Sequence, residues 1–411
     1  MSKICLSKHM LGEKHHLIQD SRQGKFFWTD TVPDDTWTYG DPWSDSSIEE
    51  LAWGICRDLP SWPPLAQKQA MTSLVGSERL SLIPWARVMP KRVFKESLQD
   101  TLIKLWDIVE SEAAVTYGPV CLRAQKLLLG FRKASIDQVA WRVFRDKEAS
   151  VGGQVDVIES FRSKDGRAEQ ALYSRKTHTG RATIEAGPKI LRLKREMRSI
   201  LKSEQTEGKI WIADYSSVEP RVMLSTAALL SDLELPDDRE DVYEHVAKSV
   251  PGNLGRAEVK IVVMGILFGI GIPKLREVLG TRCDAVSAMS EIKDYFRVKK
   301  LQNELVRQFE KDRCIQTAYG RILKPPRSDA SGLLSYYVQG TGADLSFEGF
   351  YDICKYLEER NADVSSLFSI HDALIFDAHT QTAEYLLKES LAAGERSTKL
   401  PGIFPLEMKT I

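Results

Sequence analysis

Ile210-Trp211-Ile212-Ala213-Asp214 is an apolar run of strand type that ends in a carboxylate. A second run of the same kind, Phe368-Ser369-Ile370-His371-Asp372, lies far downstream in the chain. Short apolar runs of this length favour strands, so each strand is expected to carry one aspartate at its end. Two carboxylates brought together in this way can bridge a pair of divalent cations, because hard cations prefer oxygen ligands. The sequence therefore predicts a two-metal site made of Asp214 and Asp372, with Mg²⁺ as the expected ion and Mn²⁺ as the alternative.

Between the two aspartates, Arg256, Lys260, Met264 and Phe268 recur at intervals of four residues. Residues spaced in this way drift slowly around one face of a helix, so two cations precede two bulky apolar groups. Cations suit phosphates, and the apolar pair suits a base. Together with the paired carboxylates, this helix indicates nucleotidyl-transfer chemistry on a nucleoside triphosphate.

The overall charge neither requires nor excludes nucleic acid as a partner. The 411 residues include 57 Lys and Arg and 57 Asp and Glu, which gives a net charge of zero. Proteins that bind nucleic acid are often basic, so neutrality counts against this class unless the charges are segregated. The segments Arg87 to Lys147 and Arg175 to Lys202 are rich in Lys and Arg, whereas Asp30 to Asp58 is acidic. We therefore expect basic and acidic surfaces to be separated in the fold.

Cysteine usage and apolar runs bear on the compartment of the protein. The six cysteines are scattered without a CxxC pair, which favours reduced thiols over a disulfide framework or a zinc site. The first twenty residues are polar and do not resemble a signal peptide. The longest apolar run, Ile261 to Ile272, is too short to cross a bilayer and predicts a single helix buried on several sides. No membrane partner is expected.

Six stretches of the chain resemble the motifs of family A DNA polymerases, in the order in which that family has them. They are Thr177-His178-Thr179-Gly180-Arg181, the palm motif Asp214 to Val222, the fingers helix Arg256 to Gly269, Thr317-Ala318-Tyr319-Gly320-Arg321, Gln339-Gly340-Thr341-Gly342-Ala343-Asp344, and Ile370-His371-Asp372. The resemblance covers roughly residues 165 to 411. It implies an α+β fold, the right-hand polymerase fold, with an antiparallel palm sheet, helical fingers and a helical thumb.

The same resemblance sets the expected domain boundaries. Residues 1–90 form a tryptophan-rich N-terminal segment of unknown role, and residues 91–164 occupy the place of the thumb. The first part of the palm spans 165–230, the fingers span 231–310, and the second part of the palm spans 311–411. The N-terminal segment is either a small accessory domain packed by its aromatics or a docking surface for a replication partner.

The resemblance also implies roles for individual residues. Asp214 and Asp372 are catalytic, and both bind metal together with the backbone carbonyl of Tyr215. Lys260 doubles as a triphosphate ligand and as the acid for the departing pyrophosphate. The expected substrate-binding residues are Arg256, Lys260, Met264, Phe268, Glu219, Tyr243 and Tyr215. The expected contacts to primer-template DNA are Arg181, Thr179, Gln339, His371 and Arg321.

Several positions depart from the family pattern. Phe268 stands where the family commonly has Tyr, and Met264 replaces an aromatic residue. Tyr243 takes the place of a family His, and Ala373 that of the Glu after the second catalytic Asp. Glu219 lies at the position that excludes a ribose 2′-hydroxyl, and in relatives the Tyr hydroxyl commonly bonds this Glu. The loss of that hydroxyl puts the strength of sugar selection in question.

These inferences predict a template-directed DNA polymerase that adds dNTPs to a primer 3′-hydroxyl and carries no proofreading or 5′ nuclease. Two alternatives remain open on the sequence: a single-subunit RNA polymerase or reverse transcriptase, and a catalytically silent protein that binds primer-template in replication. The one early Asp-x-Glu triplet, Asp146-Lys147-Glu148, is expected to be a surface charge cluster. The substituted motifs favour a cytoplasmic protein encoded by a bacterium, phage or plasmid, or an organellar one.

Overall fold

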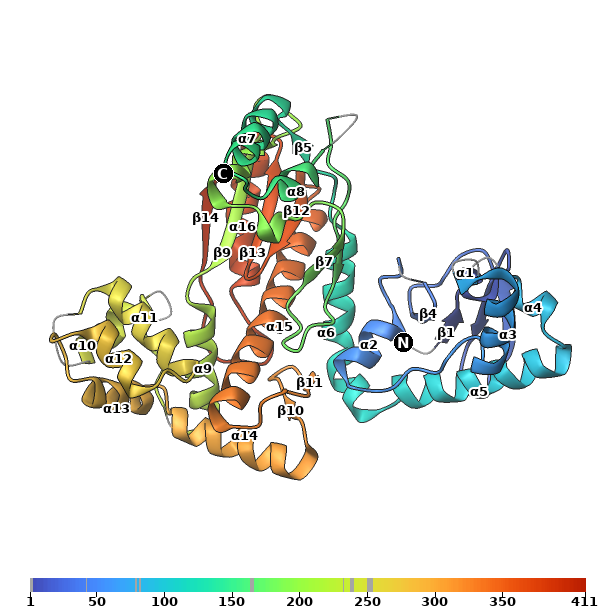
Figure 1. Cartoon of the computed structure of the whole chain (residues 1–411), viewed down its shortest axis with the longest axis horizontal. Coiled ribbons are helices and arrows are strands. Elements are labelled where there is room, and N and C mark those ends of the chain that lie inside the picture. The colour runs from blue at the N-terminus through green and yellow to red at the C-terminus, as the bar shows by residue number, and fades with distance from the viewer. Residues whose placement is uncertain are drawn as a thin grey trace. The chain divides into compact units, whose positions relative to one another are not determined.

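The computed structural model describes residues 3–41, 43–77, 80, 83–162, 166–231, 233–236, 240–249 and 254–411. Its contacts divide the chain into two compact units, Met1–Leu129 and Gly130–Ile411. Both units mix helices with sheets, and the main sheet of the second unit is antiparallel (Figure 1). The α+β prediction is therefore confirmed.

The first unit is built on a four-stranded sheet in the order β3-β2-β1-β4. Its strands are β1 (Lys3–Leu6), β2 (His16–Gln19), β3 (Phe26–Thr29) and β4 (Thr36–Tyr39). Strand β1 pairs antiparallel with β2 and parallel with β4. The helices of this unit are α1 (Lys8–Leu11), α2 (Ile48–Gly54), α3 (Leu65–Val75), α4 (Trp85–Val88), α5 (Lys91–Val109) and α6 (Glu112–Leu129).

The tryptophans of the first unit are divided between its core and its surface. Trp37 on β4 is buried, whereas Trp28, Trp43 and Trp53 are exposed. The Nε1 of Trp106 on α5 donates a hydrogen bond of 2.7 Å to the Gln19 side chain at the end of β2. Helix α5 thus packs with the N-terminal sheet, and the contacts divide the chain at residue 129 and not at residue 90. The role of residues 91–164 as a thumb stays a prediction.

The second unit contains the sheet that carries both expected catalytic aspartates. Its antiparallel order is β12-β13-β9-β14, with β9 (Lys209–Tyr215), β12 (Val364–Ile370), β13 (Ala373–Ala378) and β14 (Leu406–Thr410). Apolar side chains of β9, β12 and β13 pack into a buried cluster with Trp141, Phe161 and Ile200. Helices α15 (Ala330–Glu359) and α16 (Gln381–Gly394) pack against each other, and α16 also contacts β13 (Figure 1).

A helical group lies between β9 and β12 in the chain and corresponds in position to the expected fingers. It comprises α10 (Val242–Ser249), α11 (Arg256–Leu267), α12 (Ile272–Leu279), α13 (Ala285–Tyr295) and α14 (Val298–Asp312), whereas α9 (Val218–Leu230) precedes it within the expected palm. The prediction of one helix over Ile261 to Ile272 is wrong. Helix α11 ends at Leu267 because Gly269 has a φ of +85°, a conformation that a helix cannot contain, and Ile261 is 57% exposed.

Shorter elements complete the second unit. They are α7 (Gln138–Ser150), α8 (Val155–Glu159), β5 (Ser135–Ile136), β6 (Leu172–Ser174), β7 (Thr183–Ala186), the 3₁₀ turns Ile190–Arg192 and Arg195–Ile200, β8 (Leu201–Lys202), β10 (Ile315–Gln316) and β11 (Ile322–Leu323). No disulfide links the cysteines, all six of which lie in the described ranges. Among the described helices, none is both long enough and apolar enough to cross a membrane.

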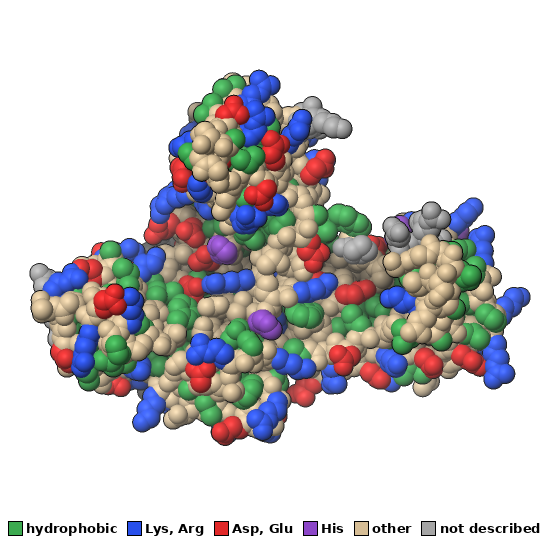
Figure 2. Space-filling view, in the orientation of Figure 1, with side chains coloured by type: hydrophobic (Ala, Val, Ile, Leu, Met, Phe, Trp, Pro, Cys, Tyr) green, Lys and Arg blue, Asp and Glu red, His purple; other side chains and the backbone are tan. Residues whose placement is uncertain are grey.

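The face drawn in Figure 2 does not show separate acidic and basic surfaces. Figure 2 shows acidic and basic side chains interspersed over the visible face of each unit. The sequence predicts that the triplet Asp146-Lys147-Glu148 is a surface charge cluster. Glu148 departs from this prediction. It is buried and accepts hydrogen bonds from Lys194 Nζ and from the Gln154 backbone amide, each of 2.8 Å. Glu148 therefore holds α7 to later segments of the chain, whereas Asp146 and Lys147 are exposed as the sequence predicts.

Candidate active site

The two aspartates lie at neighbouring strand ends. Asp214 is the penultimate residue of β9, and Asp372 belongs to the two-residue turn between β12 and β13. In the register of β9 and β13, Asp214 stands opposite Ala373, and the Tyr215 amide donates a hydrogen bond of 3.0 Å to the Asp372 carbonyl. His371, at the first turn position, has a φ of +55°. The tight hairpin therefore brings Asp372 beside Asp214, as the sequence predicts.

The electrostatics of this pair favour a cation. Burial and the neighbouring Asp372 raise the pKa of Asp214 to about 6, and Glu407 opposite it on β14 acts in the same direction. Lys409 and Lys260 act in the opposite direction. Asp214 loses its proton less readily than an ordinary aspartate, because a second carboxylate lies beside it. A divalent cation bound there would stabilise the ionised form of both groups.

The donor set fits a cation site of two carboxylates and one carbonyl. The side chain of Tyr215 is buried, and its hydroxyl donates a hydrogen bond of 2.6 Å to the Gly394 carbonyl. Only the backbone of Tyr215 is therefore available to a metal. Within the described residues, no group of three or more His, Cys, Asp or Glu side chains is arranged to hold a metal by itself. Asp214, Asp372 and the Tyr215 carbonyl would thus need substrate or water oxygens to complete an octahedral shell.

The two predicted phosphate-binding cations share one aromatic ring. Arg256 opens α11, and its Cζ lies 5.7 Å from the centre of the Tyr243 ring, while Lys260 Nζ lies 5.8 Å from the same ring. The Tyr243 hydroxyl contacts the Met264 sulfur at 3.6 Å. Arg256 Nε also donates a hydrogen bond of 2.8 Å to Asp241, which caps α10. An incoming triphosphate would therefore have to replace Asp241 as the partner of Arg256.

Phe268 falls just past the end of this helix. It is the C-cap residue of α11, and its amide donates a hydrogen bond of 3.0 Å to the Met264 carbonyl. Its ring is half-buried. The four-residue series is thus helical up to Met264, and Phe268 follows in the turn.

A pocket beside Asp372 gathers five of the residues predicted from sequence. It is lined by Arg181, Val218, Glu219, Gln339, Gly342, Ala343, Ser346, Phe347, His371 and Asp372. Within it, Arg181 Nη2 donates a hydrogen bond of 2.7 Å to Glu219 Oε1. Sequence reasoning missed this ion pair, because nothing in the spacing of the two residues links them.

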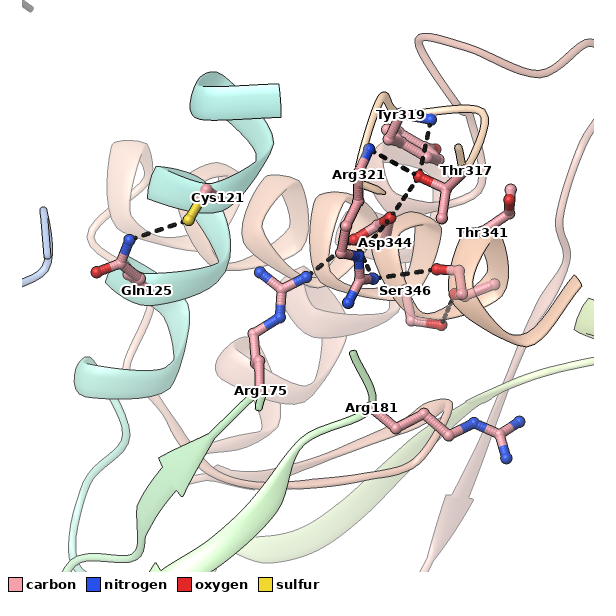
Figure 3. A network of polar contacts seen from close by, with 12 residues as sticks. Cys121, Gln125, Arg175, Arg181, Thr317, Tyr319, Arg321, Thr341, Asp344 and Ser346 are labelled. Atoms are coloured by element: carbon pink, nitrogen blue, oxygen red, sulfur yellow. Dashed lines mark hydrogen bonds and ion pairs between the residues drawn. The ribbon is translucent and has the colours of Figure 1, made fainter. Parts of the chain in front are cut away.

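Arg321, one of the predicted DNA contacts, lies in the interior. Its side chain is 3% exposed and donates to Asp344 through Nε, at 3.2 Å, and through Nη2. Asp344 also accepts hydrogen bonds of 2.9 Å from Arg175 and from the Thr317 hydroxyl (Figure 3). A direct contact of Arg321 with DNA would require this network to open.

The buried network supports the loop that carries Thr179 and Arg181. Gly180 has a φ of +67°, and a Cβ at this position would overlap the Arg321 guanidinium. The Thr177 hydroxyl donates a hydrogen bond of 2.9 Å to the Arg181 carbonyl, which closes the loop. Figure 3 shows the Arg181 side chain extending away from the Asp344 network. The loop backbone is therefore held by its contacts with Arg321 and Thr177, while the Arg181 guanidinium reaches the pocket.

We expect Gly180→Ala to destabilise the second unit and to displace the Arg181 loop. The new methyl group meets Arg321, and the left-handed backbone is strained for alanine, so the free energy of unfolding should fall by about 2 kcal/mol or more. Gly152→Ala is the matched control, because Gly152 has a φ of +63° and nothing within 4 Å of its Cβ position. Chemical denaturation of both variants measures the free energy of unfolding. An equal decrease in the two variants would show that contact with Arg321 does not add to the cost of a methyl group at residue 180.

Comparison with known proteins agrees with the geometry. The sequence profile of DNA polymerase family A matches residues 147–400. DNA polymerase I of Bacillus subtilis (strain 168) is 26% identical over 246 residues, which is 54% of this chain and 28% of that protein. DNA polymerase I of Aquifex aeolicus is 23% identical over 257 residues, which is 58% of this chain and 43% of that protein. The chain thus spans well under half the length of these curated relatives.

A solved structure shares the fold over the whole chain. The polymerase domain of Pol1 from M. smegmatis, in complex with DNA primer-template and dNTP, superposes with a TM-score of 0.67 and covers 100% of this chain and 94% of that one. At 15% sequence identity this likeness concerns the fold. Because the family profile matches more than half of the residues, the chain belongs to DNA polymerase family A.

Proposed function

We propose that this protein is a template-directed DNA polymerase that adds dNTPs to a primer 3′-hydroxyl by two-metal-ion nucleotidyl transfer. The observation that carries the proposal is the juxtaposition of Asp214 and Asp372 at neighbouring strand ends, with Lys260 close enough to influence the pKa of Asp214. Binding alone would require neither the paired carboxylates nor a nearby cation. This argues for catalysis over a silent accessory role.

The metals, Mg²⁺ or alternatively Mn²⁺, would supply charge neutralisation and a more acidic 3′-hydroxyl when bound to Asp214, Asp372 and the Tyr215 carbonyl. Arg256 and Lys260 would hold the triphosphate, with Arg256 exchanging Asp241 for a phosphate oxygen. The 3′-hydroxyl loses its proton to solvent water as its oxygen forms a bond to the α-phosphorus, and the bond between the α-phosphorus and the bridging oxygen of the β-phosphate breaks. Lys260 can then give a proton to the departing pyrophosphate.

The remaining predicted residues would position the nucleotide and the DNA. Met264 lies beside Tyr243, and Phe268 follows in the turn, where its ring could stack near the template base. Gln339 and His371 line the pocket next to Asp372, together with Arg181 and Glu219. Their donors could reach minor-groove acceptors that every correct base pair presents. DNA binding by Thr179 would follow from its place in the same loop as Arg181.

Primer extension tests the proposal. A labelled primer-template is incubated with the full chain and Mg²⁺, with dNTPs or with NTPs, and EDTA removes the metal in a parallel reaction. We expect templated extension with dNTPs only, and none with EDTA. Extension with NTPs alone would favour the RNA polymerase alternative, and DNA binding without extension would favour the silent one.

The pKa of Asp214 predicts how cation binding depends on pH. This pKa lies above its ordinary value of 3.8, at about 6, so the cation-free folded state holds the proton more tightly than the unfolded chain. The associated stability is present below the ordinary value and is lost as the pH rises through about 6. A cation competes with the proton, so its affinity should fall by up to about tenfold for each pH unit below that value. Titration with Mn²⁺ followed by electron paramagnetic resonance measures this.

The variant Asp214→Asn serves as the control for that titration. It removes the titrating group, so the residual affinity for Mn²⁺ should be weak and nearly independent of pH in this range. A pH dependence that persisted unchanged in Asp214→Asn would assign the effect to another group.

The proposal leaves out a proofreading exonuclease. Its support is that the two carboxylates of the early Asp-x-Glu triplet are separated, because Glu148 is buried and bound to Lys194 and Gln154 while Asp146 is exposed and paired with Arg145. Incubation of a 3′-labelled primer with Mg²⁺ and no nucleotides should therefore release no label. Stepwise release that Asp214→Asn does not remove would reveal a separate nuclease site.

A further inference from the structure

Glu219 has a charged partner that the family pattern does not lead one to expect. It lies in the first turn of α9, and its side chain is 15% exposed. Arg181, from the loop between β6 and β7, donates a hydrogen bond of 2.7 Å from Nη2 to Glu219 Oε1. A largely buried carboxylate is costly without such a partner, so this ion pair decides where the Glu219 side chain lies.

The hydrogen bond from Arg181 is of a strong kind. An Arg–carboxylate hydrogen bond is stronger than one from a neutral phenol, because the donor is charged. Phe268 has no hydroxyl with which it could bond Glu219, whereas Arg181 does bond it.

Arg181 is itself held in a fixed position. The loop that carries it is closed by Thr177, whose hydroxyl bonds the Arg181 carbonyl, and Gly180 lies directly against the Arg321 guanidinium. Arg321 in turn is bound by the buried Asp344. Because the loop backbone cannot shift without disturbing this network, Arg181 presents Glu219 with a preorganised donor.

The ion pair lies in the pocket beside Asp372. Arg181, Glu219 and Asp372 line the same pocket. If Asp372 binds metal as proposed, the position of Glu219 affects which sugar can be placed next to it.

We propose that Arg181 is the positioning residue for Glu219, and that selection of deoxyribose over ribose depends on this ion pair. The inference rests on the proposed polymerase function. It makes Arg181 a determinant of sugar selection in addition to any contact with the primer.

The test compares kcat/KM for a dNTP and the matching NTP on one primer-template. The variants are Arg181→Met, which keeps the aliphatic stem, and Arg181→Lys, which keeps the charge. We expect Arg181→Met to lower the ratio of the two kcat/KM values by about tenfold, since it removes a charge-assisted hydrogen bond. Arg181→Lys should retain most of the selection.

A matched surface pair controls for the loss of any Arg–Glu contact. Arg307 bonds Glu304 at 2.7 Å on α14 with a side chain that is 77% exposed, so Arg307→Met should leave the ratio unchanged. If Arg181→Met reduced dNTP and NTP incorporation equally, Arg181 would act through DNA or folding alone and the inference would be wrong. A loss of selection in Arg181→Lys equal to that in Arg181→Met would also overturn it, because the charge at residue 181 would then not position Glu219. Absence of dNTP incorporation by the unmodified protein would instead reject the proposed function.

Discussion

Asp214→Asn should abolish nucleotide incorporation, with a loss in kcat of about 10³-fold or more, while primer-template binding is retained. An amide keeps the size of the side chain but removes the negative charge that attracts a divalent cation. In the folded protein this carboxyl group is already difficult to ionise, because burial and Asp372 raise its pKa to about 6. A divalent cation would offset the repulsion between the two carboxylates, and an amide at residue 214 offers it no negative charge.

Single-turnover incorporation measures the loss, and a fluorescence anisotropy titration of labelled primer-template measures binding. Asp372→Asn should have an effect of similar size, since both residues stand at the same end of the sheet. Asp363→Asn is the matched control, because Asp363 precedes β12 at the opposite end of the same hairpin and pairs with His379. Incorporation by Asp214→Asn within tenfold of the unmodified protein would place the chemistry elsewhere.

The local structure around the catalytic pair could be predicted from sequence. Both apolar runs are strands, each aspartate lies at a strand end or in the adjoining turn, and Arg256 to Met264 is helical. These features depend on residues close together in the chain, where periodicity is informative. The adjacency of Asp214 and Asp372 was inferred from chemistry and resemblance, since pairing between distant strands leaves no local signal.

What the sequence could not predict depends on contacts between distant segments. The Arg181–Glu219 pair and the buried Arg321–Asp344 pair each join separate elements. A sequence motif that contains Arg does not indicate whether that side chain is buried or exposed. The parallel pairing of β1 with β4 in the tryptophan-rich segment was missed for the same reason. Helix α11 ended early because Gly269 adopts a positive φ, which glycine permits but does not require.

The largest expected effect on stability comes from Asp344→Ala. Asp344 is fully buried in α15 and binds Arg175, Arg321 and Thr317. Its removal leaves two buried guanidinium groups without their shared carboxylate, and breaking a buried ion pair in this way typically costs about 3–5 kcal/mol. Urea denaturation followed by circular dichroism measures the free energy of unfolding. Glu359→Ala on the same helix is the control: its ion pair with Lys355 spans 3.8 Å at the surface, so about 0–1 kcal/mol is expected.

The same variant also tests how the buried network reaches the active site. Asp344 orients Arg321, Arg321 lies against Gly180, and the next residue, Arg181, bonds Glu219. If these contacts act in series, Asp344→Ala protein that remains folded at low temperature should lose sugar selection to the same extent as Arg181→Met. Triple replacement of Arg175, Arg321 and Asp344 by apolar residues of similar volume should recover most of the stability, because no buried charge is left unbalanced. Selection should not recover with it, since the Arg181 loop would still lack the guanidinium against which Gly180 packs.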